Sequence, residues 1–401
     1  MKIRSTSVLA YLACSILGAS AVSAQRTWIV KKHQDQGVDF VEIQSAVNAA
    51  ADGDFILVGP GSYRGTVIDG KSLVIQAEPG EDVDVSGFGA VPLGSLTIQN
   101  IGANQRVAVR GIDAPVGAGG GTKSGLIVKD CSGPVLVEDA YYEGTAAFPG
   151  IVASGVLVLR SSSVTLVDCT IQAGFDVLGQ YDNGLQVTDS VVHALSCSVT
   201  GENGVALNGG ELFFSGSTAT GLSDAVVVDS SPCVGDPLVP CPVGIIPPDS
   251  IANPELTTLD AVLAPSGGGL PVRLDAGSLA ALTGKVRSFS HSSPVREGES
   301  TVEVYTGAPS ELVFWLISPT LLPGTLFPTV FGTSHLGTPN LLIKRGVVPA
   351  SGILTRSLTI NELGPGVEGF QLFGTAIFVD VGTLNLRLAN PTSIVLVDSA
   401  F

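Results

Sequence analysis

The sequence predicts an all-β protein in which a parallel β-helix is followed by a small β-sandwich. The main observation is a short run of alternating apolar residues that recurs seven times, at spacings between 20 and 30 residues. The runs begin at Leu73, Leu96, Leu126, Val156, Leu185, Val205 and Ala225. A period near 20 with two or three strands per repeat is typical of parallel β-helices, in which each turn buries its apolar face only against the next.

The composition also favours turn-rich β structure. The chain has 401 residues, of which 50 are Gly, and only 14% of its residues are charged. This length allows a large core and more than one domain. Because Gly reaches the backbone conformations that tight turns require, its abundance suits a chain of many short strands.

Residues 1–24 have the pattern of a secretory signal peptide. Basic residues near the start precede an apolar stretch from Val8 to Val22, and Ala24 closes a small-residue cleavage site. We therefore expect a secreted protein, extracellular or at the cell surface. A lipoprotein would need Cys14 as the lipidated residue, after an apolar run that is short for this purpose. No later run of about 18 apolar residues predicts a transmembrane segment.

The charge pattern argues against nucleic acid as a partner. The net charge is −16, and no Lys or Arg lies between Arg160 and Arg273, an interval that holds 12 Asp and Glu residues. Binding to a phosphate backbone needs clustered cations. A polyanionic sugar could lie on such a surface only with a bridging metal ion.

The first element expected is a helix over residues 40–51. Ile43, Ala46, Val47 and Ala50 fall at helical spacing and form one apolar stripe. An open coil has unpaired strand edges at each end, and such edges invite aggregation unless they are covered. We expect this helix to cap the N-terminal end of the coil, with a strand over residues 55–58 following it.

This opening segment resembles that of a known family. Phe40-x-x-Ile43-Gln44-x-Ala46-Val47 is followed by Gly53-Asp54-x-Ile56-x-Val58-x-Pro60-Gly61-x-Tyr63. The pattern is similar to the start of secreted proteins of the pectin-lyase-like group, and the repeats extend the likeness to about residue 230. The resemblance implies a right-handed parallel β-helix over residues 25–230. It is less specific for activity, since pectin esterases and non-catalytic surface proteins open alike.

Beyond the repeats, the chain changes character. Residues 231–256 are rich in Pro and are expected to form a linker, in which Cys233 and Cys241 flank a seven-residue loop. In an oxidising compartment these two cysteines are expected to form a disulfide. Short alternating runs divided by Gly and Pro then predict a β-sandwich-like domain over residues 257–401. Its first part, before about residue 290, could equally be further linker.

Equivalent positions on successive turns stack at about 4.8 Å, so the repeats predict neighbours. One corner column reads Asn100, Asp130, Arg160, Asp189, Gly209 and Asp229. In pectate-lyase-like enzymes an Arg removes the proton of the sugar beside carboxylates that hold calcium. By this resemblance Arg160, with Asp130 and Asp189, is the candidate catalytic group. The favoured alternative is an ion-pair ladder that relieves repulsion between the carboxylates.

The second corner column reads Gly111, Asp139, Asp168, Ser196 and Ser215. Asp139 and Asp168 would repel each other unless they are protonated or bridged by a cation. Calcium suits them because it accepts several oxygen ligands at flexible geometry. The alternative is that the two carboxylates splay into water. The sequence predicts no cofactor other than calcium.

Three repeats carry about ten extra residues, at 113–124, 141–154 and 172–183. Insertions in repeat proteins commonly build the binding face, and aromatic rings beside carboxylates suit sugars. The expected ligand-binding residues are Tyr141, Tyr142, Phe175 and Tyr181. The alternative is that these rings cover the cores of their own loops.

The remaining residues narrow the reaction classes. Cys169 and Cys197 fall in an inward-facing column with Ala140 and Gly216, as small core residues would. The four His show no zinc-ligand spacing, and the acid-bearing stretches typical of pectin esterases and polygalacturonases are absent. The sequence therefore favours a secreted, non-catalytic β-helix protein that binds polysaccharide or a cell-surface partner. A calcium-dependent polysaccharide lyase and a purely structural exported protein are the alternatives.

Overall fold

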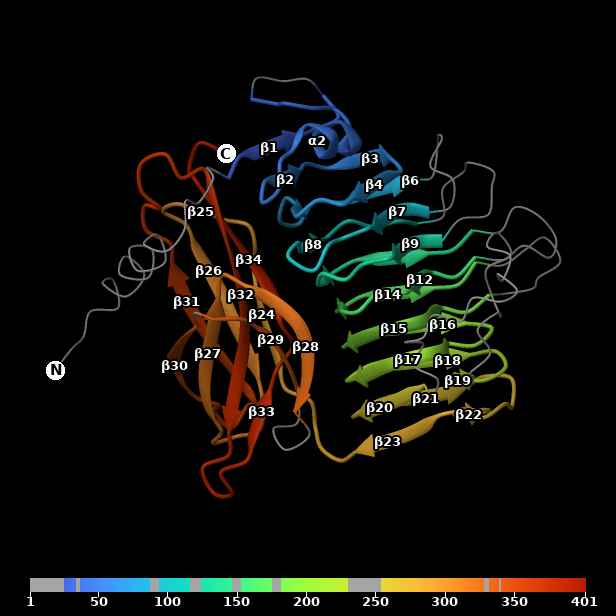
Figure 1. The fold of residues 1–401 in the computed structure, drawn as a ribbon. Helices are drawn as coiled ribbons and strands as arrows, with labels where there is room; N and C mark the ends of the chain where they lie inside the picture. Colours follow the sequence, from blue (N-terminus) through green and yellow to red (C-terminus); the bar gives the residue numbers. More distant parts are fainter. Residues whose placement is uncertain are drawn as a thin grey trace.

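The computed structural model describes most of the chain outside its first 24 residues. The ranges described are 25–33, 37–86, 94–115, 124–145, 153–174, 182–229, 254–327, 332–338 and 340–401. Within these ranges the protein is all-β apart from one short helix, and a large, mostly parallel sheet dominates it. This arrangement is compatible with a parallel β-helix (Figure 1). The expected signal peptide and the Cys233–Cys241 pair lie outside the described residues.

The parallel strands lie on three faces of the coil. Along each face, the strand of one turn pairs with the strand of the next turn. The first face contains β4 (Thr66–Asp69), β7 (Gly94–Gln99), β9 (Ser124–Lys129), β12 (Val156–Leu159), β19 (Val226–Asp229) and β22 (Val272–Leu274). The second contains β1 (Thr27–Val30), β2 (Phe55–Val58), β5 (Leu73–Ala77), β8 (Val107–Arg110), β10 (Val135–Glu138), β13 (Val164–Val167), β20 (Glu255–Leu259) and β23 (Ser278–Leu282). Two long strands, β15 (Leu185–Leu195) and β17 (Val205–Ser215), span both faces.

The third face is a separate parallel sheet. Its strands are β11 (Tyr141–Glu143), β14 (Thr170–Gln172), β16 (Ser198–Gly201), β18 (Thr218–Gly221) and β21 (Val262–Pro265). The short pair β3 (Gly61–Arg64) and β6 (Val83–Ser86) precedes this sheet, and single bridges at Asp113 and Ala114 connect the two.

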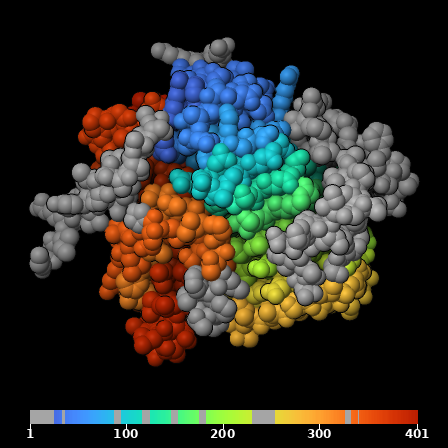
Figure 2. Space-filling view, in the orientation of Figure 1, coloured from blue at the N-terminus to red at the C-terminus, as the bar shows by residue number. Residues whose placement is uncertain are grey.

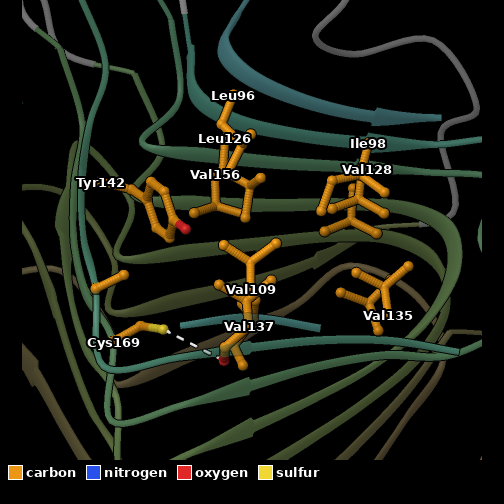
Figure 3. Packing of buried hydrophobic residues seen from close by; sticks show 14 of the residues in the cluster. Leu96, Ile98, Val109, Leu126, Val128, Val135, Val137, Tyr142, Val156 and Cys169 are labelled. Atoms are coloured by element: carbon orange, nitrogen blue, oxygen red, sulfur yellow. Dashed lines mark hydrogen bonds between the residues drawn. The ribbon is translucent and has the colours of Figure 1, made fainter. Parts of the chain in front are cut away.

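The interior of the coil is a stack of equivalent apolar residues. Leu126 pairs with Leu96 on one side and with Val156 on the other, and all three are fully buried. Figure 3 shows these side chains in one line, with Ile98 above Val128 beside them. Because alternate residues of a strand point to opposite sides, this column fixes the register of every turn.

Helix α2 (Ile43–Ala49) lies at the N-terminal end of the coil, where its apolar stripe enters the core (Figure 1). It is shorter than the expected 40–51. The Lys71 ammonium donates to the carbonyls of Val47, Asn48 and Ala50, at 2.8–3.1 Å. A cation at the C-terminal end of the helix satisfies carbonyls that the helix leaves unpaired, and it interacts favourably with the negative end of the helix dipole.

Parallel pairing continues well beyond residue 230, which corrects the expected domain boundary. β20 and β23 extend the second face, β22 extends the first, and β21 extends the third. The coil thus includes residues 255–282, which were expected to belong to the linker and the C-terminal domain. The repeats were missed because these strands pair through Thr and Ala as well as through large apolar residues.

The C-terminal residues form two sheets around a second core, antiparallel except for the short pair of β25 with β34. One sheet contains β24 (Ser288–His291), β26 (Ser300–Thr306) and β31 (Ile353–Thr359). The other contains β25 (Val295–Arg296), β27 (Leu312–Ser318), β30 (Leu341–Val347), β32 (Gly369–Val379), β33 (Leu386–Leu388) and β34 (Thr392–Val397). A hairpin of β28 (Leu321–Phe327) and β29 (Gly332–Leu336) adjoins them. Trp315, Tyr305 and Phe378 are buried between the sheets.

This antiparallel region, residues 286–401, packs along the outer side of the second face (Figures 1 and 2). We call this contact the seam. From the coil it buries outward-facing residues on successive turns, two of them on β2: Ile29, Phe55, Leu57, Val74, Ala108, Leu136, Val167, Leu195, Phe213 and Leu259. From the antiparallel region it buries Leu321, Leu336, Phe373, Val395 and Val397. The two regions therefore share an apolar cluster at their contact, in addition to the core that each has of its own.

Polar contacts in the seam are also buried. The Glu138 carboxylate accepts hydrogen bonds from the Ser393 backbone N–H at 2.9 Å and from the Ser393 hydroxyl at 2.5 Å. The Arg110 guanidinium donates to the carbonyl oxygens of His291 and Ser393. Because a buried carboxylate is costly without such partners, these contacts fix the position of the antiparallel region along the coil.

Candidate binding face and corner columns

The two corner columns are real features of the coil, and their backbone explains their residue types. The first contains Asn100, Asp130, Arg160, Asp189 and Gly209, and the second Gly111, Asp139, Asp168, Ser196, Gly216 and Asp260; all have φ between 44° and 82°. Asn, Asp and Gly adopt this left-handed conformation more readily than other residues. The strand register shows that two expected members do not belong to the columns. Asp229 pairs with Asn208 and not with Gly209, and Ser215 pairs with Leu195 and not with Ser196.

Several corners are followed by a Ser or Cys that points into the coil, a pattern of which the sequence predicted only Cys169 and Cys197. These residues include Cys131, Ser161, Ser190, Cys169, Cys197 and Ser217. Each donates to the carbonyl two residues earlier. The Ser217 oxygen also accepts the N–H of Cys197, at 2.8 Å. Ser217 thus replaces Gly216 as the neighbour of Cys197 in this column.

Cys131, Cys169 and Cys197 are free and buried. A hydrogen bond with the Cys197 thiol, together with burial, raises the pKa of the Cys169 thiol, so this group stays protonated. These residues therefore behave as small core side chains. The signal available in the sequence was a Ser or Cys directly after several corner residues, as at Asp130-Cys131, Arg160-Ser161 and Asp189-Ser190.

Arg160 is brought beside both predicted carboxylates. Its guanidinium binds Asp130 through two hydrogen bonds, of 2.7 and 3.1 Å, and both side chains are exposed. Burial raises the pKa of the Asp189 carboxyl, while the charge of Arg160 lowers it. An exposed two-point ion pair of this kind contributes little to stability. To act as a base, the Arg160 guanidinium would first have to break its hydrogen bonds to Asp130.

Asp139 and Asp168 occupy equivalent corners on successive turns, as predicted. Burial by neighbouring protein atoms, with the charges of Glu138 and Asp139, raises the pKa of Asp168 to about 6, although its side chain still reaches solvent. Within the described ranges, no three His, Cys, Asp or Glu side chains form a group that could hold a metal ion. A calcium site here remains a prediction that rests on two carboxylates.

The expected ligand-binding aromatics separate into three cases. Tyr141 lies on the outer side of β11, half-buried, and its hydroxyl donates to Glu143 at 2.8 Å. Burial and Glu143 raise the pKa of Tyr141 to about 12. Tyr142 is wrong as a binding residue, because it is fully buried and points into the coil (Figure 3). Phe175 and Tyr181 lie outside the described residues.

The reason for the Tyr142 error is strand parity. The expected insertions at 141–154 and 172–183 begin inside strands, since β11 and β14 end at Glu143 and Gln172. Tyr142 pairs with Ile171, which in turn pairs with Val199, and all three face the core. Aligning these three residues would have assigned Tyr142 to the interior.

The outer side of the third face carries polar side chains in regular ranks, and we call it the hydroxyl face. One rank runs down the turns as Tyr141, Thr170, Ser198 and Thr218, and the next as Glu143, Gln172, Thr200 and Thr220. Thr170, Ser198 and Thr200 are exposed. Successive members of a rank are spaced at the separation of paired strands, about 4.8 Å.

The hydroxyl face can form hydrogen bonds without carrying much charge. Its hydroxyls are donors as well as acceptors, Gln172 adds an amide, and the Tyr141 ring lies at its upper edge. The Asp139–Asp168 corner borders the same strands, because each corner residue precedes a strand of the third face by two positions. The arrangement can thus bind a polyhydroxylated ligand with carboxylates at one side.

Comparison with known proteins gives no family to which the chain can be assigned: no family model matches it, and no curated protein is significantly similar to it. In the ranges that the structure describes, no helix is both long and apolar enough to cross a lipid bilayer.

Proposed function

We propose that this chain is a secreted, non-catalytic protein that binds a neutral polysaccharide on its hydroxyl face. The observation that carries the proposal is the pair of ranks headed by Tyr141 and Glu143. A sugar chain presents hydroxyls that can both donate and accept, and its C–H faces pack on aromatic rings. A neutral chain fits better than a polyanion because the protein carries a net charge of −16.

The finer description of the fold belongs to the same proposal. In it the coil is a right-handed parallel β-helix of the pectin-lyase-like group, capped by α2, and the antiparallel region is a β-sandwich. The resemblance of residues 40–63 and the parallel register support the first part. The buried core between two antiparallel sheets supports the second. Residues 1–24 would direct export, with the protein acting outside the cell or at its surface.

The direct test is a binding screen of the full chain against neutral and acidic polysaccharides, followed by substitutions on the face. We expect Thr170→Val with Thr200→Val to weaken retention on a neutral polysaccharide, because the change removes two hydroxyls while keeping the side-chain shape. The matched control is Thr306→Val with Thr355→Val, at exposed positions on β26 and β31. Equal loss in both double variants, or no retention of the wild type, would overturn the proposal.

A calcium-dependent polysaccharide lyase is the second candidate, and the Arg160–Asp130 pair is the observation that favours it. The same screen should therefore follow the absorbance of unsaturated products, with calcium and with a chelator. A lyase would form such products, and Arg160→Ala would abolish them while leaving binding largely intact, because loss of proton transfer lowers turnover rather than affinity. We expect no product from the wild type.

A further inference from the structure

The two ends of the coil differ in how their strand edges are covered. At the N-terminal end, α2 buries Ile43, Ala46 and Val47 over the first turn. At the other end, β21, β22 and β23 each pair with one neighbour only, within the described part of the chain. This last turn forms the lower end of the coil in Figure 1. Open sheet edges are templates for pairing with another chain.

Side chains that belong to the interior are exposed at this end. Leu274 pairs with Val228, which is 0% exposed, yet Leu274 itself is 47% exposed. Leu279 pairs with Leu256, which is 1% exposed, yet Leu279 is 43% exposed. Two inward-facing leucines on adjacent open strands thus lack the next turn that every earlier turn has.

The charges on Arg273 of β22 and on Asp275, the residue after this strand, match those of a second copy running in the opposite direction. Arg273 and Asp275 lie on the same side of the strand, 3.0 Å apart, with Leu274 between them. If two copies pair antiparallel about Leu274, Arg273 of each faces Asp275 of the other. Asp275 donates its N–H to Val228. By alternation the N–H and C=O of Leu274 point away from β19, toward such a partner.

We propose that this end of the coil is the interface of a symmetric dimer, in which a second copy of the chain pairs with β22 across a two-fold axis. The axis passes through the first face, so β23 of one copy lies over β21 of the other, and Leu274 and Leu279 become buried. The operation exchanges the second and third faces. The two antiparallel regions therefore lie on different sides of the joint. An isologous interface of this kind closes, leaving no edge for further growth.

The test is the mass of the full chain in solution by light scattering over a dilution series. We expect twice the mass of one chain at high concentration, and a single-chain mass for Leu274→Asp. Leu342→Asp is the control, because Leu342 is 52% exposed on β30, away from the joint. Asp275→Lys should weaken the dimer at least tenfold, since it sets two cations opposite each other.

Cross-linking tests the antiparallel register itself. In Leu274→Cys the two new thiols face each other across the axis, so mild oxidation should give a covalent dimer that a reductant reverses. Leu342→Cys and the wild type should give none. A wild type that stays a single chain at every concentration would overturn the proposal. So would a dimer that survives Leu274→Asp and does not cross-link through Leu274→Cys.

Discussion

The second and third faces of the coil carry the same type of side chain on their inner sides and different types on their outer sides. Both point large apolar residues into the coil at alternate positions. Outward, the second face carries Leu57, Val74 and Leu136, which the antiparallel region covers, whereas the third carries Thr170 and Ser198, which are exposed. The inner pattern thus determines the coil, and the outer pattern determines what each face contacts.

The largest expected effect is in the seam. Phe373 is fully buried there, with the Arg106 guanidinium 5.6 Å above its ring. We expect Phe373→Ala to lower the free energy of unfolding by about 3–5 kcal/mol, because the cavity cannot collapse between two rigid sheets. Denaturant titration measures this. Thr170→Ala on the hydroxyl face should change the same quantity by less than about 0.5 kcal/mol. Similar losses at both sites would contradict the comparison.

Lowering the pH should also destabilise the native state, through buried His residues at the seam. Burial lowers the pKa of His193 to about 4 and that of His291 to about 3, and it lowers that of His335 as well. The unfolded chain binds protons at these groups below about pH 6.5, while the native state does not. Stability should therefore fall as the pH drops from about 6.5 to 4, by roughly 3 kcal/mol for His193.

Melting curves between pH 7 and pH 4 check this expectation. His193→Gln should flatten the pH dependence of the melting temperature, whereas His33→Gln, at an exposed position, should leave it unchanged. Asp168 acts in the opposite direction. Its raised pKa means that the native state holds a proton between about pH 4 and 6 that the unfolded chain has released, so its contribution falls as the pH rises through this range. A melting temperature that is constant over the whole range would be evidence against a neutral buried His group.

A smaller loss is expected from the buried carboxylate of the seam. Glu138→Ala leaves the Ser393 N–H and hydroxyl without their acceptor, which should cost about 1–3 kcal/mol of unfolding free energy. Glu138→Gln is the matched control, because its amide oxygen can still accept, and it should lose less. Equal stability of Glu138→Ala and the wild type would show that this contact does not hold the seam.

The smallest effect is expected at the first corner column. Arg160→Ala removes an exposed pair with Asp130, so it should change the unfolding free energy by less than about 1 kcal/mol. Raising the salt concentration should reduce even this difference. A loss as large as that of Phe373→Ala would mean that the corner, and not the seam, limits stability.

Much of the coil follows from local pattern, and the seam does not. The alignment that stacks Asp130, Arg160 and Asp189 is correct because two independent signals, apolar alternation and a corner residue, fix the same register. The seam was missed because Leu136 and Val167 extend apolar runs without revealing what covers them. Its partners, such as Phe373, lie more than 200 positions later in the sequence, and no local rule connects them.

The order of elements along the chain gives the seam a consequence for folding during synthesis. The apolar strip from Ile29 to Leu259 is complete before most of residues 286–401 have been made, yet it is those residues that cover it in the described part of the structure. At about 5–20 residues per second, the delay is on the order of 6 to 23 seconds. Thr27 itself donates its N–H to Glu368, so even the first strand waits for the last hundred residues. A nascent chain of this protein therefore exposes a long apolar surface during this interval. A chaperone that shields the surface would have to act within the same interval.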